Sequence, residues 1–356
     1  IDKLTEVPFI LNRAQRKLLL KQETMRLNNE PIRILLVKAR QWGGSTETQM
    51  YAGWIQIEHI KGWNSSIVAD VKEQAAGMRR MYERLLDSYP SELQNLTWTN
   101  FQGQQNVKYI KERDFTIAIG SMQRPETIRS SDIRIFHGTE IASWVKTKGK
   151  SPEDLMQSIE GTLPEVPYSF STLESTAKGV GNYFHKMYLL AINKETNYKL
   201  VFIPWFDIDK YSRPLTGNAV DFVKSMSDYE QFLWDEGATL EAINWYRIKS
   251  KSINDEWRMK SEYPTTAEEA FQSTGRPVFH QSYILKLNIH TGVPFEVGIL
   301  EADAVKGEKA LMNITFLNLE SGYLKVWSRP VPYSDDPVKD RYCVSLDIGG
   351  ASKDAD

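Results

Sequence analysis

Cysteine is almost absent from this sequence. Cys343 is the single cysteine among 356 residues, so no disulfide can form within the chain and no zinc site built on cysteines is available. The five histidines are scattered and form no H-x-x-x-H pair, which leaves a histidine metal site unsupported. These absences fit a reducing compartment, and we expect a cytoplasmic protein.

Long apolar runs and an excess of one charge are also lacking. No stretch of about 18 apolar residues occurs, which argues against a membrane span. The first residues form no basic and then apolar leader, so we expect no secretion signal. The net charge of −2 argues against a strongly basic surface for nucleic acid, although a local patch can still contact DNA.

The first two thirds of the sequence alternates short apolar runs with helical patterns. This alternation predicts a mostly parallel sheet covered by helices, and such sheets bind ligands at the carboxyl ends of their strands. The predicted strands are 33–38, 66–70, 114–120, 133–137, 169–174 and 199–204, and the first two predicted helices are 45–59 and 71–86.

The character of the sequence changes after about residue 205. Helical patterns cover 221–237, 239–251 and 256–271, and strand patterns begin again near residue 314. Segments 314–320, 323–330 and 342–350 indicate the opening strands of a second sheet, with a turn at 321–322. The sequence therefore predicts three parts, at 1–210, 211–310 and 311–356.

Residues 38–46 (KARQWGGST) join a predicted strand to a predicted helix and contain residue types that a phosphate-binding loop needs. Gly43 and Gly44 allow backbone amides to turn inward at a helix N-terminus. A hydroxyl at the helix start, from Ser45 or Thr46, can ligate Mg²⁺.

The cation of this loop does not stand in its usual place. Gly44 occupies the position where a lysine ordinarily precedes the hydroxyl residue, so the positive charge has to come from Lys38 or Arg40. A plain Gly-Gly turn between a strand and a helix explains the same residues equally well.

An acid follows the predicted strand 133–137. In an ATPase a glutamate at this place orients and deprotonates the attacking water, and Glu140 fits that role. Thr139 stands where aspartate is more usual; its hydroxyl can touch the water shell of a metal but adds no charge. Alternatively, Glu140 only N-caps or charges the first turn of segment 141–145.

Several motifs together resemble those of the large terminase subunit of tailed double-stranded DNA phages. They fall in the order of that family and cover nearly the whole chain. The motifs are an adenine-reading glutamine segment at 9–15, the nucleotide loop at 38–45, a glutamate motif at 138–144, a coupling motif at 174–184, and the segments FIPWF at 202–206 and EYPTTAEEAF at 262–271.

The resemblance implies a fold and an activity. It implies an ASCE-type P-loop NTPase domain over 1–210, a helical linker over 211–310, and the truncated start of a ribonuclease-H-like nuclease over 311–356. The implied activity is that of a viral packaging motor, in which ATP hydrolysis moves double-stranded DNA into a procapsid. A metal-dependent endonuclease, incomplete in this sequence, would cut the DNA concatemer.

The resemblance also assigns roles to residues. It implies catalysis by Glu140 and Arg40, and Mg²⁺ at Ser45 and, through water, at Thr139. It implies nucleotide binding by Gln15, Lys38, Arg40, Gln41, Gly43, Gly44, Ser45 and Thr46, with Phe9 packing near the adenine, and coupling of hydrolysis to movement by Ser175, Thr176 and Ala177.

Simpler readings remain open for these positions. Gln15 can be an exposed helical residue, and Ser175 or Thr176 can cap an ordinary turn. Asn182 is expected to cap a helix that begins at Tyr183. Weaker candidates for a phosphate-sensing arginine are Arg129, Arg79 and Arg80.

In the nuclease segment, Asp347 at a strand end would be the first ligand for Mg²⁺ or Mn²⁺. Asp354 or Asp356 would add a second ligand, and an ordinary turn-forming acid is the alternative. We do not expect this sequence alone to cut DNA.

The resemblance implies partners as well. These are double-stranded DNA, a portal protein, a small terminase subunit and further copies of the chain in a ring on the portal, in the cytoplasm of an infected or lysogenic bacterial host, with no membrane involved. The alternatives are a helicase-like ATPase that remodels nucleic acid, and a binding module without catalysis. A helicase would be expected to carry further arginine motifs on a second motor domain.

Overall fold

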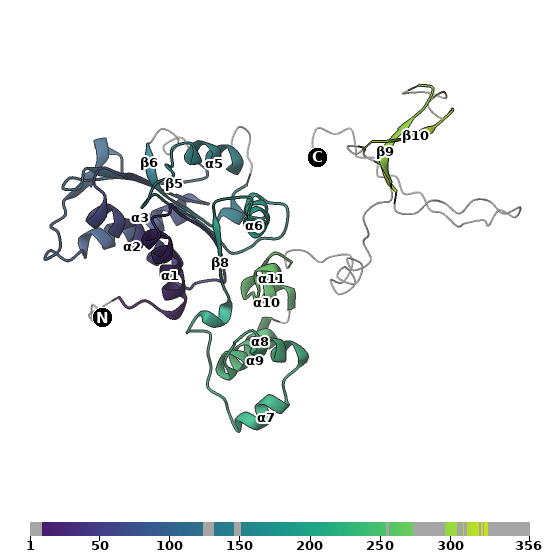
Figure 1. Ribbon diagram of the computed structural model, residues 1–356. Coiled ribbons are helices and arrows are strands. Elements are labelled where there is room, and N and C mark those ends of the chain that lie inside the picture. The colour runs from purple at the N-terminus through teal and green to yellow at the C-terminus, as the bar shows by residue number, and fades with distance from the viewer. Residues whose placement is uncertain are drawn as a thin grey trace, which may run out of the picture. The chain divides into compact units, whose positions relative to one another are not determined.

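The computed structural model describes residues 9–123, 132–145, 151–253 and 256–272, and in the C-terminal part residues 296–304, 309, 312–319, 322 and 324–326. The chain divides into two compact units, 1–275 and 276–356 (Figure 1). The following paragraphs describe each unit by itself.

An eight-stranded sheet forms the centre of the first unit, in the order β3-β4-β5-β2-β6-β7-β1-β8. In this spatial order, neighbouring strands from β5 through β2, β6, β7 and β1 to β8 are parallel. At the opposite edge, β4 is antiparallel to both β3 and β5. The strands are β1 Ile32–Lys38, β2 Asn64–Ala69, β3 Trp98–Asn100, β4 Val107–Ile110, β5 Phe115–Ser121, β6 Ile133–Thr139, β7 Phe170–Ser175 and β8 Lys199–Ile203.

Every strand that the sequence predicts for this unit is present, and the predicted α/β fold is confirmed. The two strands that it does not predict, β3 and β4, are the short antiparallel additions at the edge. They span only three and four residues, too few for an apolar alternation to stand out from a loop.

Helices cover both faces of this sheet (Figure 1). They are α1 Arg13–Leu27, α2 Gly44–Trp54, α3 Lys72–Asp87, α5 Pro152–Glu160 and α6 Tyr183–Ile192, and the π-helix Ile55–His59 continues α2. In β1, Ile34 and Leu36 pack in one core with α1 and α2, while Leu35 and Val37 pack in another with α5 and α6. Burial on both faces explains why residues 34–37 of the strand are all apolar.

Short helices follow the sheet in the same unit, where the sequence predicts helical structure. They are α7 Ala219–Lys224, α8 Asp228–Asp235, α9 Leu240–Ile253, α10 Glu256–Glu262 and α11 Ala267–Gln272. The single helix predicted for 221–237 is two helices, because Ser227 and Glu230 form a capping box that starts α8 anew. Pro264 lies between α10 and α11, where a proline ends helical structure.

The second unit contains a small antiparallel sheet in the order β10-β9-β11. Its strands are β9 Glu296–Glu301, β10 Thr315–Asn318 and β11 Leu324–Val326. β10 and β11 are predicted from the sequence, whereas β9 lies in the range 211–310 for which a helical linker is predicted.

Some predicted features lie outside the described residues. These are Arg129, Cys343, Asp347, Asp354, Asp356 and the strand predicted at 342–350. Among the residues that are described, no helix combines the length and the apolar character needed to cross a membrane.

Candidate functional site

The loop between β1 and α2 has an unusual backbone. Gln41 and Gly43 both have positive φ angles, of 55° and 82°, and Gly43 is the N-terminal cap of α2 in the left-handed region. A Cβ atom at Gly43 would lie 2.8 Å from Nε2 of Gln15. Both the backbone angle and the close approach therefore favour glycine at this position.

Gly44 is required for a different reason. A Cβ atom there would lie 1.9 Å from Cζ2 of Trp42, whose side chain is almost fully buried. No residue with a side chain fits at position 44 while Trp42 lies there. This packing explains physically why the loop lacks the usual lysine.

Gln15 anchors the loop to the start of α1. Its Nε2 donates to the carbonyl of Gly43 (2.9 Å), and its Oε1 accepts from the backbone N–H of Asn12 (3.0 Å). Asn12 donates in turn to the carbonyl of Trp42 (2.9 Å). Gln15 is therefore buried rather than an exposed helical residue, and both polar atoms of its amide are engaged within the chain.

Arg40 points away from the centre of the site. Its Nε lies 2.8 Å from Oε2 of Glu262, and its side chain is 59% exposed. The backbone carbonyl of Arg40 accepts from the hydroxyl of Tyr211 (2.9 Å), and that of Gln41 accepts from Lys210 Nζ (2.7 Å). The segment at 210–211 thus holds the loop on the side opposite Gln15.

Lys38, the other predicted cation, is buried at the end of β1. Its ammonium donates to Oε1 of Glu140 (2.8 Å) and lies 3.8 Å from Oε2 of Glu174. Burial lowers the pKa of Lys38, but the two carboxylates raise it by more, so the pKa lies above its ordinary value. Lys38 is therefore a charged lysine held between two acids.

Glu140 directly follows β6 and has a strained backbone. Its φ and ψ are 54° and 41°, a left-handed conformation that costs a residue with a side chain about 1–3 kcal/mol. Besides Lys38, its carboxylate accepts from the hydroxyl of Thr176 (3.3 Å). It makes no capping hydrogen bond to the following 3₁₀ turn, so the simpler reading as a helix cap finds no support.

The predicted coupling residues lie beside this glutamate at the end of β7. Ser175 Oγ accepts from the backbone N–H of Ala142 (3.1 Å) and donates to the carbonyl of Thr176 (2.7 Å). Ala177 is buried. Through Ser175 and Thr176, the end of β7 is connected both to Glu140 and to the turn that follows it.

Two central residues of the site, Glu174 and His137, are not among the candidates that the sequence indicates. Glu174 Oε1 accepts from the hydroxyl of Ser45 (2.5 Å) and lies 3.0 Å from Nε2 of His137. Both residues are buried in the interior of strands. For Glu174 the signal was an acid at the end of the predicted strand 169–174, since a fully buried carboxylate requires partners.

One oxygen of the site, the hydroxyl of Ser45, suits Mg²⁺. The hydroxyl of Ser45 lies on the first turn of α2 and donates to Glu174, and Mg²⁺ prefers such hard oxygen ligands together with substrate phosphates. Thr139 is buried and pairs with Glu174 in the register of β6 and β7.

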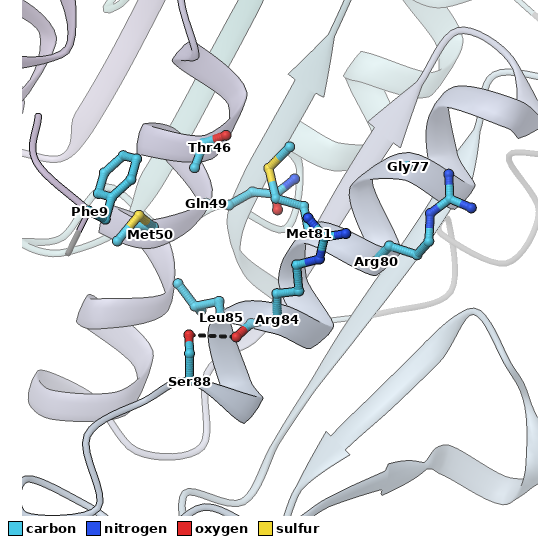
Figure 2. A pocket seen from close by; sticks show the side chains of 10 residues that line it. All are labelled: Phe9, Thr46, Gln49, Met50, Gly77, Arg80, Met81, Arg84, Leu85 and Ser88. Carbon is cyan, nitrogen blue, oxygen red and sulfur yellow. Dashed lines mark hydrogen bonds between the residues drawn. The ribbon is translucent and has the colours of Figure 1, made fainter. Parts of the chain in front are cut away.

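A pocket of about 500 Å³ opens between α2 and α3. Figure 2 shows Phe9 and Met50 on one side of it, with Gln49 and the side chains of α3 beside them. Oε1 of Gln49 is buried and has no hydrogen-bond partner among the described residues. The lining residues are Phe9, Thr46, Gln49, Met50, Gly77, Arg80, Met81, Arg84, Leu85 and Ser88.

Comparisons with known proteins find similarity in structure only. No protein-family model matches the chain, and no curated protein matches it in sequence. The ATPase domain of the large terminase of Thermus phage P74-26 aligns with 14% identity over 74% of this chain and 94% of its own (TM-score 0.45). The large terminase of bacteriophage D6E in complex with ADP aligns with 11% identity over 83% and 62% (TM-score 0.46).

The large terminase of bacteriophage HK97 gives a TM-score of 0.52 at 12% identity, over 84% of this chain and 59% of that protein. The chain therefore has the fold of phage large terminases.

Proposed function

We propose that this chain is the ATPase of a DNA-packaging motor and hydrolyses ATP at the loop between β1 and α2. One observation carries the proposal: the ion pair between Lys38 and Glu140. The two residues come from β1 and from the end of β6, with β7 between these strands. Their meeting beside a glycine loop supplies a phosphate cation and a general base in one place.

The phosphates would lie at the N-terminus of α2, where the helix dipole and free backbone amides favour anions. Lys38 can donate to a terminal phosphate, and Ser45 can hold Mg²⁺ with Thr139 contacting the metal through water. When bound, the metal would neutralise charge that develops on the phosphate oxygens. Arg40 would have to release Glu262 before it could reach a phosphate.

Glu140 would accept the proton of the attacking water. In the free protein its carboxylate is occupied by Lys38 and Thr176, so a phosphate that attracts Lys38 would also release Glu140 for this task. Thr176 and its neighbours Ser175 and Ala177 would then change their contacts with Glu140. A change of this kind at the end of β7 is a reasonable route from hydrolysis to movement.

The nucleoside would lie in the pocket between α2 and α3, next to Thr46 on the first turn of α2. Phe9 and Met50 offer apolar contacts for a base. Arg84 can approach the sugar and phosphates, and Oε1 of Gln49 can accept a hydrogen bond from an amino group of the base. Gln15 would contribute indirectly, because it holds the carbonyl of Gly43.

The wider function follows from the motif order and from the fold shared with the HK97 large terminase. The proposal includes translocation of double-stranded DNA into a procapsid by a ring of copies on a portal protein, with a small terminase subunit, in a bacterial host. It also includes a metal-dependent endonuclease, to which Asp347 would contribute.

ATP turnover by the wild-type chain and by Glu140→Gln tests the proposal. We expect the variant to bind nucleotide but to hydrolyse it at least about 100-fold more slowly, because it lacks the general base. Equal turnover by the two proteins would refute the assignment. Separation of duplex strands by the wild-type protein, without translocation of intact duplex, would instead favour the helicase-like alternative.

A further inference from the structure

Glu174 is a fully buried carboxylate where three elements of the site meet. It belongs to β7, which lies between β1 and β6. In the strand register it is opposite Leu36 of β1 and Thr139 of β6. Lys38 reaches it from β1, and Ser45 reaches it from α2.

The contacts of Glu174 are divided between its two oxygens. Oε1 accepts from Ser45 and lies within hydrogen-bond distance of His137, at 2.5 and 3.0 Å. Oε2 has no hydrogen-bond partner among the described residues and lies 3.8 Å from Lys38 Nζ. One oxygen thus serves the hydroxyl and the imidazole, and the other faces the ammonium.

The carboxylate of Glu174 is fully buried, and its neighbours are the ammonium of Lys38, the imidazole of His137 and the hydroxyl of Ser45. A buried carboxylate with such partners is costly to leave unpaired, so it holds them in place.

The contact with Ser45 determines how that hydroxyl can be used. A serine hydroxyl has one hydrogen to donate and two lone pairs to offer. Since its hydrogen is donated to Glu174, the lone pairs remain available to a metal. A serine that was free to rotate would spend part of its time with the hydrogen directed at the metal.

The contact with Lys38 holds the lysine that would supply the positive charge of the loop. The lysine extends from the end of β1 instead of from the start of α2. An ammonium has three N–H donors. One donates to Glu140, while the charge of Glu174 attracts the ammonium from 3.8 Å, so N–H donors remain available for a phosphate.

We propose that Glu174 is a positioning residue that orients the Ser45 hydroxyl toward Mg²⁺ and fixes Lys38 for the phosphates. This inference rests on the proposed ATPase function. Glu174 touches neither the phosphates nor the attacking water in this scheme; it acts through Ser45 and Lys38.

Binding of ATPγS with Mg²⁺ and with EDTA tests the inference, measured by thermal shift and by titration on the full chain. In wild type we expect Mg²⁺ to tighten binding. In Glu174→Gln we expect this Mg²⁺-dependent gain to shrink by about 10- to 100-fold, the usual effect of losing a residue that orients a metal ligand. The amide keeps the size of the side chain but loses the charge.

Ser171→Ala is the matched control. Ser171 is also buried in β7, where its hydroxyl bonds to that of Tyr198, and this change should leave the Mg²⁺ gain as in wild type. The double variant with Ser45→Ala should lose no more of the Mg²⁺ gain than Ser45→Ala alone, because this gain depends on the same hydroxyl in both variants.

The outcomes separate the two proposals. If wild type neither binds nor hydrolyses ATP, the proposed function fails. If wild type hydrolyses ATP and Glu174→Gln keeps the full Mg²⁺ gain, or loses binding equally with Mg²⁺ and with EDTA, the positioning role fails. Should Glu174→Gln not fold, Ser45→Ala alone decides, since an undiminished Mg²⁺ gain in that variant overturns the inference.

Discussion

Two regions, one at the N-terminus of α2 and one along its flank, differ in how far their polar groups are already paired. At the N-terminus of the helix, Lys38, Glu140, Glu174 and Ser45 are bonded to one another. Along its flank, the pocket toward α3 has apolar walls, and the structure gives neither Arg80 nor Arg84 an acidic partner among the described residues.

The difference shows which end of a nucleotide would have to displace protein contacts. Phosphates would compete with ion pairs that the protein makes within itself, whereas a nucleoside would enter a preformed space. Changes in the paired cluster should therefore affect turnover and stability together. Changes in the open pocket should affect nucleotide affinity alone.

Lys38→Met is the severest test of the paired cluster. It removes the cation between Glu140 and Glu174 and leaves a buried carboxylate without its ion pair, a loss of about 3–5 kcal/mol in the free energy of unfolding. ATP turnover should fall at least about 100-fold, since the phosphate also loses its cation. Urea unfolding and steady-state kinetics measure the two effects, and a variant as stable as wild type would contradict the pairing.

Glu47 should make the stability of the protein depend on pH. It is buried on α2 beside Gln22, and burial raises the pKa of Glu47 to about 8. The folded state therefore holds a proton that the unfolded state releases above about pH 4.5, so this group lowers stability as pH rises from there to about 8. Glu47→Gln should remove that decline, a gain on the order of a few kcal/mol at pH 8.

Chemical unfolding of Glu47→Gln and wild type at pH 5 and pH 8 measures this effect. The difference between the two proteins should be small at pH 5 and larger at pH 8. A difference that stays constant across this range would show that Glu47 does not titrate as its burial implies.

Gly44→Ala tests whether packing keeps lysine out of the loop. The new methyl group would meet the ring of Trp42, and a clash of this kind costs about 1–3 kcal/mol. Gly77→Ala in α3 is the control, because a Cβ there meets nothing within 4 Å, and it should be neutral or stabilising. Equal melting temperatures for Gly44→Ala and wild type would contradict the packing explanation.

Phe9→Ala has the smallest expected effect and tests the open pocket. Loss of an aromatic contact with the base should raise KM for ATP several-fold, corresponding to about 1 kcal/mol. The turnover number and the melting temperature should stay as in wild type, because Phe9 is half exposed. A fall in turnover at unchanged KM would place the nucleoside elsewhere.

Much of the fold could be predicted because its signals are local. The apolar run of β1 and the glycines after it predict a strand, a loop and a helix in that order, and Asn182 caps α6 as expected. The break between α7 and α8 was missed because the apolar pattern continues through it, while a single serine cap decides it. The strands β3 and β4 depend on partners along the sheet edge rather than on their own few residues.

The sequence by itself determined the α/β alternation, the glycine loop with its displaced cation, and the glutamate after β6, because spacing and residue type carry these features. Only the tertiary structure showed that Lys38 is buried between two acids whereas Arg40 is exposed and pairs with Glu262. The two acids near Lys38 come from other parts of the chain. The tertiary structure also brought Glu174 and His137 into the site and engaged the Gln15 amide within the chain. Contacts between residues more than 25 positions apart create this arrangement, and no local pattern contains them.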